Sequence, residues 1–164
     1  MSNQVYSNDK SKYIEQRGVV LYSLTTNAIT NLDGLKKLTW APQLIQDDKV
    51  VSISAIDDTF TALKDGIYTI SINLTFVDSV SPATNVIQTD VQITAVKNAV
   101  GPLTISSDLS RYYPLLAMTG NTGASKCLTT SIYLQGGESF YVQVASLSPT
   151  GITFRYSNIF ITLQ

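Results

Sequence analysis

The chain has 164 residues, of which 44% are hydrophobic and only 14% charged, and its formal net charge is −1. A chain of this length fits one domain, whose core is large enough to need neither a disulfide nor a structural metal. The small net charge and the scattered Lys and Arg residues argue against a nucleic-acid partner, because phosphate binding needs several cations on one surface. A surface with few charges is easier to desolvate, which favours a protein that contacts copies of itself.

The first 17 residues are polar and show no periodic pattern of apolar residues. They contain no apolar segment like that of a secretory signal, and no apolar run in the chain approaches the ~18 residues of a membrane span. We therefore expect no membrane insertion and, if Met1 is the natural start, synthesis in the cytosol. Residues 1–17 are predicted to be a flexible or partner-ordered arm, and residues 18–164 a single domain. The apolar residues of the arm are candidate tethers to a partner: Val5, Tyr6, Tyr13 and Ile14.

From Gly18 onward the chain divides into short runs rich in Val, Ile, Thr, Tyr and Phe, and no run has the apolar period of a helix. The predicted strands are, in chain order, Gly18–Leu24, Leu38–Ile45, Lys49–Ala55, Thr59–Ala62, Gly66–Asp78, Asn85–Lys97, Leu103–Ser106, Tyr112–Met118, Cys127–Gln135, Glu138–Leu147 and Gly151–Leu163. Strands of this number and spacing predict an antiparallel sandwich or barrel.

The longest predicted strands alternate between apolar and polar residues. One face of the run at 67–76 carries Tyr68, Ile70, Ile72, Leu74 and Phe76, and the other carries Thr69, Ser71, Asn73 and Thr75. A second run alternates in the same way, with Phe140, Val142 and Val144 on its apolar face. Strict alternation is typical of antiparallel strands with one face against the core.

Glycines mark the turns between these strands. Gly66 follows Lys64 and Asp65 at a predicted tight turn, where a positive φ or a close approach of the backbone would exclude a Cβ atom. Gly136 and Gly137 form the turn of a second predicted hairpin. These three glycines are the candidate structural turn residues.

The segment around the turn at Gly66 resembles a family signature. The run from Phe60 to Ile70 resembles the Phe-x-x-Pro-x-x-Gly-x-Tyr-x-Phe motif of the TNF and C1q superfamily. Phe60, Gly66 and Tyr68 match it in spacing, whereas Leu63 stands in place of the proline and Ile70 in place of the last aromatic residue.

Two later stretches are similar to the same family. The run from Ser131 to Val144 is similar to its Leu-x-x-Gly-Asp-x-Val-x-Val hairpin, with Gly137 and Glu138 standing for Gly-Asp. The segment 156–163 is similar to the aromatic strand that closes the domain. The stretches occur in the family's order.

The resemblance implies a fold and an assembly. The fold is an all-β, antiparallel jelly-roll sandwich of about 8–10 strands, TNF/C1q-like, and the assembly is a homotrimer formed through aromatic residues of one sheet. Taken alone, Phe60, Tyr68 and Phe160 favour an ordinary core over an interface. The candidates for core or trimer interface are Phe60, Tyr68, Tyr133, Phe140, Tyr156 and Phe160.

The chemistry of most enzymes is missing from the chain. It contains no histidine, which excludes a Ser-His-Asp triad and a His-ligated zinc site. Cys127 is the only cysteine, so no disulfide can form within the chain, and we expect a small, buried apolar side chain there. The acidic pairs at 47–48 and 57–58 fall in predicted turns, and no ligand spacing indicates calcium. We expect no catalysis, no cofactor and no metal.

Three classes of function remain open. The first is a virion structural or attachment component, such as a head fibre, a capsid decoration or a spike knob, tethered to the capsid by residues 1–17 and made in the host cytosol. The second is a soluble, extracellular TNF/C1q-like ligand that binds a receptor. The third is a glycan-binding jelly roll, in which Trp40 and the pair Tyr112 and Tyr113 would stack on sugar rings.

Overall fold

The structure is a computed structural model that describes residues 19–30, 32–45, 50–54, 56–78, 87–112, 123–147 and 151–164. Within these ranges the chain forms strands and turns, which confirms the all-β prediction. No helix occurs there, and hence none with the length and hydrophobicity needed to cross a membrane. The arm at 1–17, with its candidate tethers Val5, Tyr6, Tyr13 and Ile14, lies outside the described residues.

The described residues form twelve strands: β1 (Val19–Leu24), β2 (Ala28–Ile29), β3 (Lys36–Lys37), β4 (Trp40–Ile45), β5 (Val51–Ser54), β6 (Thr59–Ala62), β7 (Gly66–Asp78), β8 (Ile87–Lys97), β9 (Gly101–Tyr112), β10 (Gly123–Leu134), β11 (Ser139–Ser146) and β12 (Ile152–Leu163).

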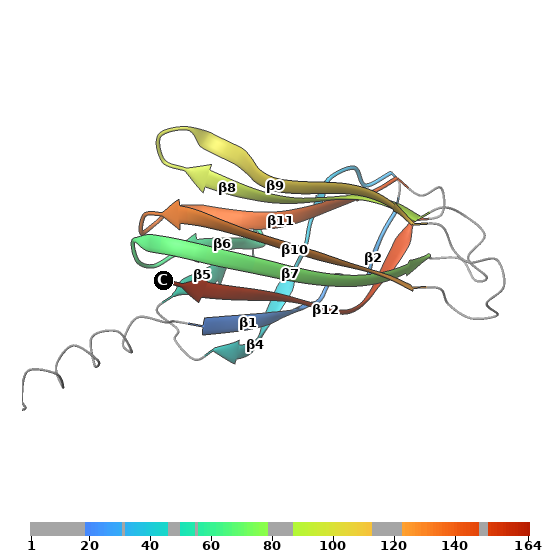
Figure 1. Cartoon of the computed structure of the whole chain (residues 1–164), viewed down its shortest axis with the longest axis horizontal. Helices are drawn as coiled ribbons and strands as arrows, with labels where there is room; N and C mark the ends of the chain where they lie inside the picture. The colour runs from blue at the N-terminus through green and yellow to red at the C-terminus, as the bar shows by residue number, and fades with distance from the viewer. Residues whose placement is uncertain are drawn as a thin grey trace, which may run out of the picture.

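These strands make two antiparallel sheets that pack face to face (Figure 1). Sheet A has the order β10-β7-β12-β1-β4, with β2 paired to β12. Sheet B has the order β5-β6-β11-β8-β9, with β3 paired to β11. Strands that follow each other in the chain thus often lie in different sheets, which is the connectivity of a jelly roll.

The core fills the space between the sheets. Its members include the residues that alternation assigned to the apolar faces of β7 and β11, which are fully buried or nearly so. The Phe60 ring stacks on Phe140 with a centroid distance of 5.1 Å, and the Tyr22 ring meets Phe60 edge-on at 5.0 Å. Each fully buried aromatic side chain contributes roughly 2–3 kcal/mol by leaving water. Trp40 also lies in this core.

The predicted strand boundaries are accurate where alternation is long and turn residues are clear. Strands β6 and β7 have the predicted bounds. The short strand predicted at Leu103–Ser106 is wrong in its bounds, because β9 runs from Gly101 to Tyr112 along β8 with one shift in register. The strand predicted at Tyr112–Met118 lies, apart from Tyr112, outside the described residues. The middle of β9 is rich in serine and has few apolar residues, so alternation did not mark it as one strand.

The reason why glycine is needed differs among the predicted turn glycines. Gly66 is the first residue of β7 and has no positive φ, so of the two predicted reasons for a glycine there the close approach applies. A Cβ atom on Gly66 would instead lie 2.4 Å from a Leu163 methyl and 3.2 Å from the Gln164 carbonyl oxygen. Gly136 and Gly137 lie in the β10–β11 turn, and Gly137 has a φ of 91°.

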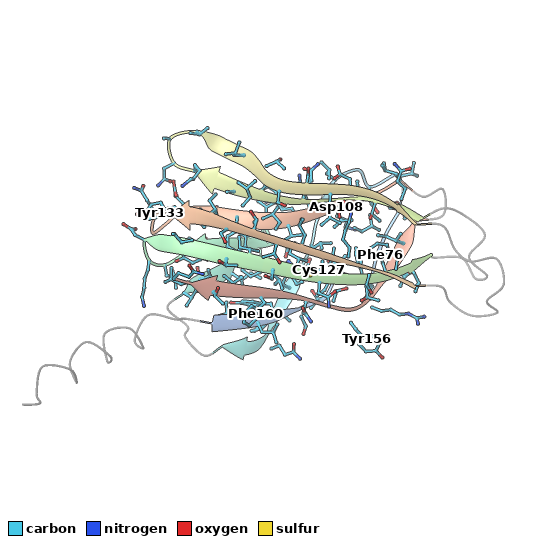
Figure 2. The ribbon with its side chains drawn as sticks, in the orientation of Figure 1. Phe76, Asp108, Cys127, Tyr133, Tyr156 and Phe160 are labelled. Atoms are coloured by element: carbon cyan, nitrogen blue, oxygen red, sulfur yellow. The ribbon has the colours of Figure 1, made fainter. Side chains whose placement is uncertain are left out.

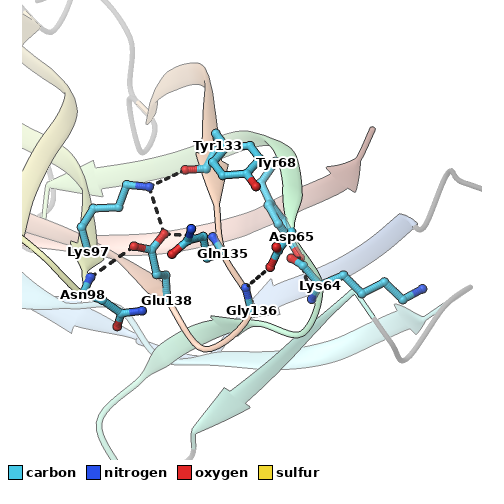
Figure 3. A network of polar contacts seen from close by, with 9 residues as sticks. All are labelled: Lys64, Asp65, Tyr68, Lys97, Asn98, Tyr133, Gln135, Gly136 and Glu138. Atoms are coloured by element: carbon cyan, nitrogen blue, oxygen red, sulfur yellow. Dashed lines mark hydrogen bonds and ion pairs between the residues drawn. The ribbon is translucent and has the colours of Figure 1, made fainter.

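A buried carboxylate joins two hairpin turns at one end of the sandwich (Figure 3). Glu138 accepts hydrogen bonds from the backbone N–H groups of Gln135 at 2.9 Å and Asn98 at 3.1 Å. The Lys97 ammonium lies 2.9 Å from the same carboxylate and donates to the Tyr133 carbonyl oxygen at 2.7 Å. The β8–β9 and β10–β11 turns are therefore held together through Glu138.

Glu138 should make the stability of the fold depend on pH. The Gln135 N–H, and after it the Lys97 ammonium, hold the pKa of Glu138 below its ordinary value of 4.5. A carboxyl group with a depressed folded-state pKa stabilises the fold above its unfolded-state pKa, and this contribution disappears as pH falls through the folded-state value. We expect Glu138→Gln to lower the free energy of unfolding by about 1–3 kcal/mol at neutral pH.

The check is urea unfolding of both proteins over a pH series. The difference in unfolding free energy between the wild type and Glu138→Gln should shrink as pH falls below 4.5. A difference that stays constant down to the lowest pH would mean that the carboxylate charge contributes nothing.

A second buried charge closes the side of the sandwich where edge strands β9 and β10 meet. Lys126 points inward from β10, with only 2% of its side chain exposed, and its Nζ pairs with the Asp108 carboxylate of β9 at 3.3 Å. The same Nζ donates to the Asp108 carbonyl oxygen. Burial lowers the pKa of Lys126, while the charge of Asp108 acts in the opposite direction. An inward charge on an edge strand also discourages pairing with a further strand.

Candidate self-association surface

The outer face of sheet A is the candidate surface for self-association, because the exposed members of the predicted aromatic set lie on it. Alternation along its strands places one set of side chains away from the core. This set consists of Leu21 and Ser23 on β1, Ile67, Thr69, Ser71, Asn73 and Thr75 on β7, Ser125, Cys127, Thr129, Ser131 and Tyr133 on β10, and Arg155, Tyr156, Asn158, Phe160 and Thr162 on β12.

Three pairs of hydroxyl groups connect β7 to β10 across this face. Thr69 lies 2.9 Å from Ser131, Ser71 accepts from Thr129 at 3.1 Å, and Thr75 lies 3.2 Å from Ser125. Each pair satisfies part of the hydrogen-bonding capacity of its members before any partner arrives. Removing water from the face therefore costs less than it would for unpaired hydroxyl groups.

The outer face of sheet A is almost free of charge. Arg155 is the one charged residue in the set given above, and it stands toward the end of the face, opposite Thr75. The outer face of sheet B is different. Lys37 lies 4.1 Å from the centroid of the Tyr141 ring there, and Asp90 accepts a hydrogen bond from Gln92 at 2.8 Å. Because the cores of protein interfaces are depleted in charge, sheet A is the better candidate.

The six predicted aromatic residues separate into two groups of three. Phe60, Tyr68 and Phe140 are fully buried in the core. The Tyr68 hydroxyl lies 2.8 Å from the Lys64 carbonyl oxygen and 3.0 Å from that of Val50, which gives its proton the partner that a buried tyrosine needs.

The other three aromatic residues, labelled in Figure 2, lie on strands of sheet A and are exposed. Tyr133 is 50% exposed, Phe160 40% and Tyr156 94%. Among the described side chains, these three are the only aromatic ones that are largely exposed, and all lie on the outer face of sheet A. Phe160 is the most central of them, because it sits on the middle strand opposite Leu21 and Ser71.

Comparison with known proteins gives a clear result only at the level of structure. No protein-family model matches the sequence, and no curated protein matches it either. Among solved structures, murine APRIL at pH 8.0 superposes with a TM-score of 0.65 at 10% identity, over 91% of this chain and 100% of that one. Eiger TNF from S. frugiperda superposes with a TM-score of 0.64 at 10% identity, over 92% and 94% of the two chains. The chain has the TNF-like jelly-roll fold.

A further structure of murine APRIL, at pH 5.0, superposes with a TM-score of 0.63 at 11% identity, over 91% of this chain and 100% of that one. The superpositions thus include the whole TNF-like jelly roll rather than one hairpin. The resemblance expected from the runs at 60–70 and 131–144 is confirmed at the level of the fold.

Cys127 corrects one prediction from the sequence. It is exposed rather than buried, and it lies on the outer face of the TNF-like jelly roll opposite Asn73. The physical reason is alternation along β10, where Lys126 and Leu128 take the inward positions and leave Cys127 on the outside. A small apolar residue type was a poorer guide to burial than its position in the strand.

Sequence reasoning missed the irregularity in β12. Ile152 and Phe154 point inward, and so do Ile159 and Ile161, although an uninterrupted strand would place these two pairs on opposite faces. This change of phase in the apolar pattern was visible in the sequence and required a bulge near Tyr156.

The described residues contain no group of three or more Cys, Asp or Glu side chains that could hold a metal ion.

Proposed function

We propose that this TNF-like jelly roll is a non-enzymatic homotrimer that associates through the outer face of sheet A and acts by binding. The observation that carries the proposal is the composition of that face. It joins three exposed aromatic side chains to paired hydroxyl groups and holds a single charge, Arg155. Aromatic enrichment with charge depletion is the composition of an interface core. Three copies fit the implication of the family motifs around Phe60 and Gly137.

The proposed setting is a virion, where the trimer serves as a head fibre, a capsid decoration or a spike knob. The low charged fraction supports this setting, because such a protein spends its life packed against other subunits. A single cysteine fits folding in the reducing cytosol of a host cell. Residues 1–17 would attach the trimer to the capsid and leave the jelly roll to face outward.

A soluble ligand is the second candidate, and the likeness to APRIL and Eiger TNF favours it. In that case the homotrimer would bind a receptor instead of a capsid. The glycan-binding alternative is weakened, because Trp40, which would stack on a sugar ring, is buried in the core. Tyr113 and the side chain of Tyr112 lie outside what the structure describes.

One experiment tests both the assembly and the setting. The full chain and a chain lacking residues 1–17 are sized by light scattering after size-exclusion chromatography. Both are expected to be trimers, the full chain at about three times 17.9 kDa and the shortened chain at three times its own smaller mass, because the arm has no periodic apolar face to contribute to the fold. When added to particles of the virus that encodes the chain, only the full chain should be incorporated.

The outcomes separate the two claims. A monomer that persists at high micromolar concentration would end the trimer proposal. A truncated trimer that joins particles normally would refute the tether. If neither form joins particles and both bind a cell-surface protein, the soluble ligand is the better function.

A further inference from the structure

Tyr156 occupies a bulge in the central strand of sheet A. Arg155 pairs with Thr75 and Asn158 pairs with Asn73, so β12 has one more residue than β7 between these two pairs. Tyr156 has a φ of 41°, in the left-handed region that residues other than glycine and asparagine rarely adopt. Its ring projects away from the ribbon in Figure 2 and is 94% exposed.

The bulge itself is fixed by hydrogen bonds. The buried Ser157 hydroxyl accepts from the Thr75 N–H at 2.9 Å and lies 2.9 Å from the Arg155 carbonyl oxygen, to which it can donate. This hydroxyl replaces a ladder bond that the bulge removes. The bulge also changes the phase of β12 so that Ile159 and Ile161 reach the core. Core packing therefore explains the bulge.

Core packing does not explain the tyrosine. An asparagine or glycine would adopt the same φ at less cost, and a ring that is 94% exposed gains almost nothing from burial within one subunit. Strained conformations that the local structure enforces are concentrated at functional sites. Tyrosine and arginine are also the residue types that most often dominate binding interfaces, and Arg155 lies directly beside Tyr156.

We propose that Tyr156, together with Arg155, inserts into a second copy of this chain and determines the strength of the assembly. This inference rests on the proposed self-association and deepens it. Tyr156 lies on the same strand and face as Phe160, so its contact would be continuous with the proposed interface.

The charge of Arg155 supports a partner patch elsewhere on the neighbouring copy. Arg155 makes no ion pair with any described residue, and the outer face of sheet A, as defined above, contains no acidic side chain. In a closed trimer each interface joins two different patches of the chain. The cation can thus meet an acidic patch that sheet A itself lacks.

The test is subunit exchange between isotopically light and heavy trimers, followed by native mass spectrometry. Tyr156→Asn keeps the positive φ and removes the ring, and it is expected to accelerate exchange at least about tenfold. Tyr156→Phe keeps the ring and should exchange within about threefold of the wild type. Ile56→Ala removes an equally exposed apolar side chain from the β5–β6 turn and is the matched control, with no expected change.

A stability measurement separates this role from a structural one. In the Phe160→Asp background, which is designed to be monomeric, Tyr156→Asn should leave the urea midpoint unchanged or raise it. A lower midpoint would mean that the tyrosine stabilises its own subunit, which overturns the proposal. Unchanged exchange of Tyr156→Asn trimers also overturns it and leaves the proposed trimer intact. A monomeric wild-type protein overturns both.

Discussion

Replacing Phe160 by aspartate is expected to convert the trimer into monomers at micromolar concentration. Phe160 lies on the middle strand of sheet A, 40% exposed, between Leu21 and Ser71. Association would desolvate three carboxylates on a face that offers no described cation except Arg155 near its end. An unpaired buried charge costs several kcal/mol, and about 4 kcal/mol corresponds to a thousandfold weaker association.

Sedimentation velocity over a concentration series measures this effect. Val100→Asp is the matched control, because Val100 is an exposed apolar residue in the β8–β9 turn, away from sheet A. It should stay trimeric, and both variants should keep the far-UV spectrum of the wild type. If Phe160→Asp remains trimeric, the self-association surface has been assigned to the wrong face.

Replacing Gly151 by alanine is expected to lower the free energy of unfolding by about 3–4 kcal/mol. Gly151 has a φ of 77°, and a Cβ atom there would lie 2.6 Å from the Ile29 carbonyl oxygen and 3.1 Å from the Thr30 Cα. Both contacts are to backbone atoms of the neighbouring segment, which cannot rotate away as a side chain would. The substitution thus combines backbone strain with a clash that must displace β2 from β12.

Gly101→Ala isolates the two contributions. Gly101 has nearly the same φ, 78°, but nothing lies within 4 Å of the position that a Cβ atom would take there. Its replacement should cost only the left-handed strain, about 1 kcal/mol. Urea unfolding of the two variants at the same protein concentration gives the difference. Equal losses for Gly101→Ala and Gly151→Ala would show that the close approach to Ile29 is readily relieved.

The family resemblance and the apolar periodicity of the sequence together predicted most of the fold. Strand β7 and its apolar face followed from alternation and from the turn before Gly66, and the structure confirms both. The burial of Phe140 followed in the same way. Periodicity succeeds here because the side-chain direction within one strand is a local property of the backbone.

The residues of the candidate surface could be predicted only in part from the sequence. The predicted aromatic set contained Phe160 and Tyr156 together with Phe60, and residue type alone did not distinguish the exposed members from the buried ones. The assignment of Cys127 to the core failed for the same reason. Residue type predicts burial on average, but the phase of the strand decides it in each case.

The sequence by itself determined that this chain forms antiparallel strands around an apolar core, because alternation of period two needs only neighbouring residues. The tertiary structure alone decided which strands share a sheet and hence which side chains form one surface. The hydrogen bond that fixes the bulge at Tyr156 joins Thr75 and Ser157, which are 82 residues apart. The inward Lys126 depends on Asp108 of another strand. Such contacts join distant segments, and no local pattern carries them.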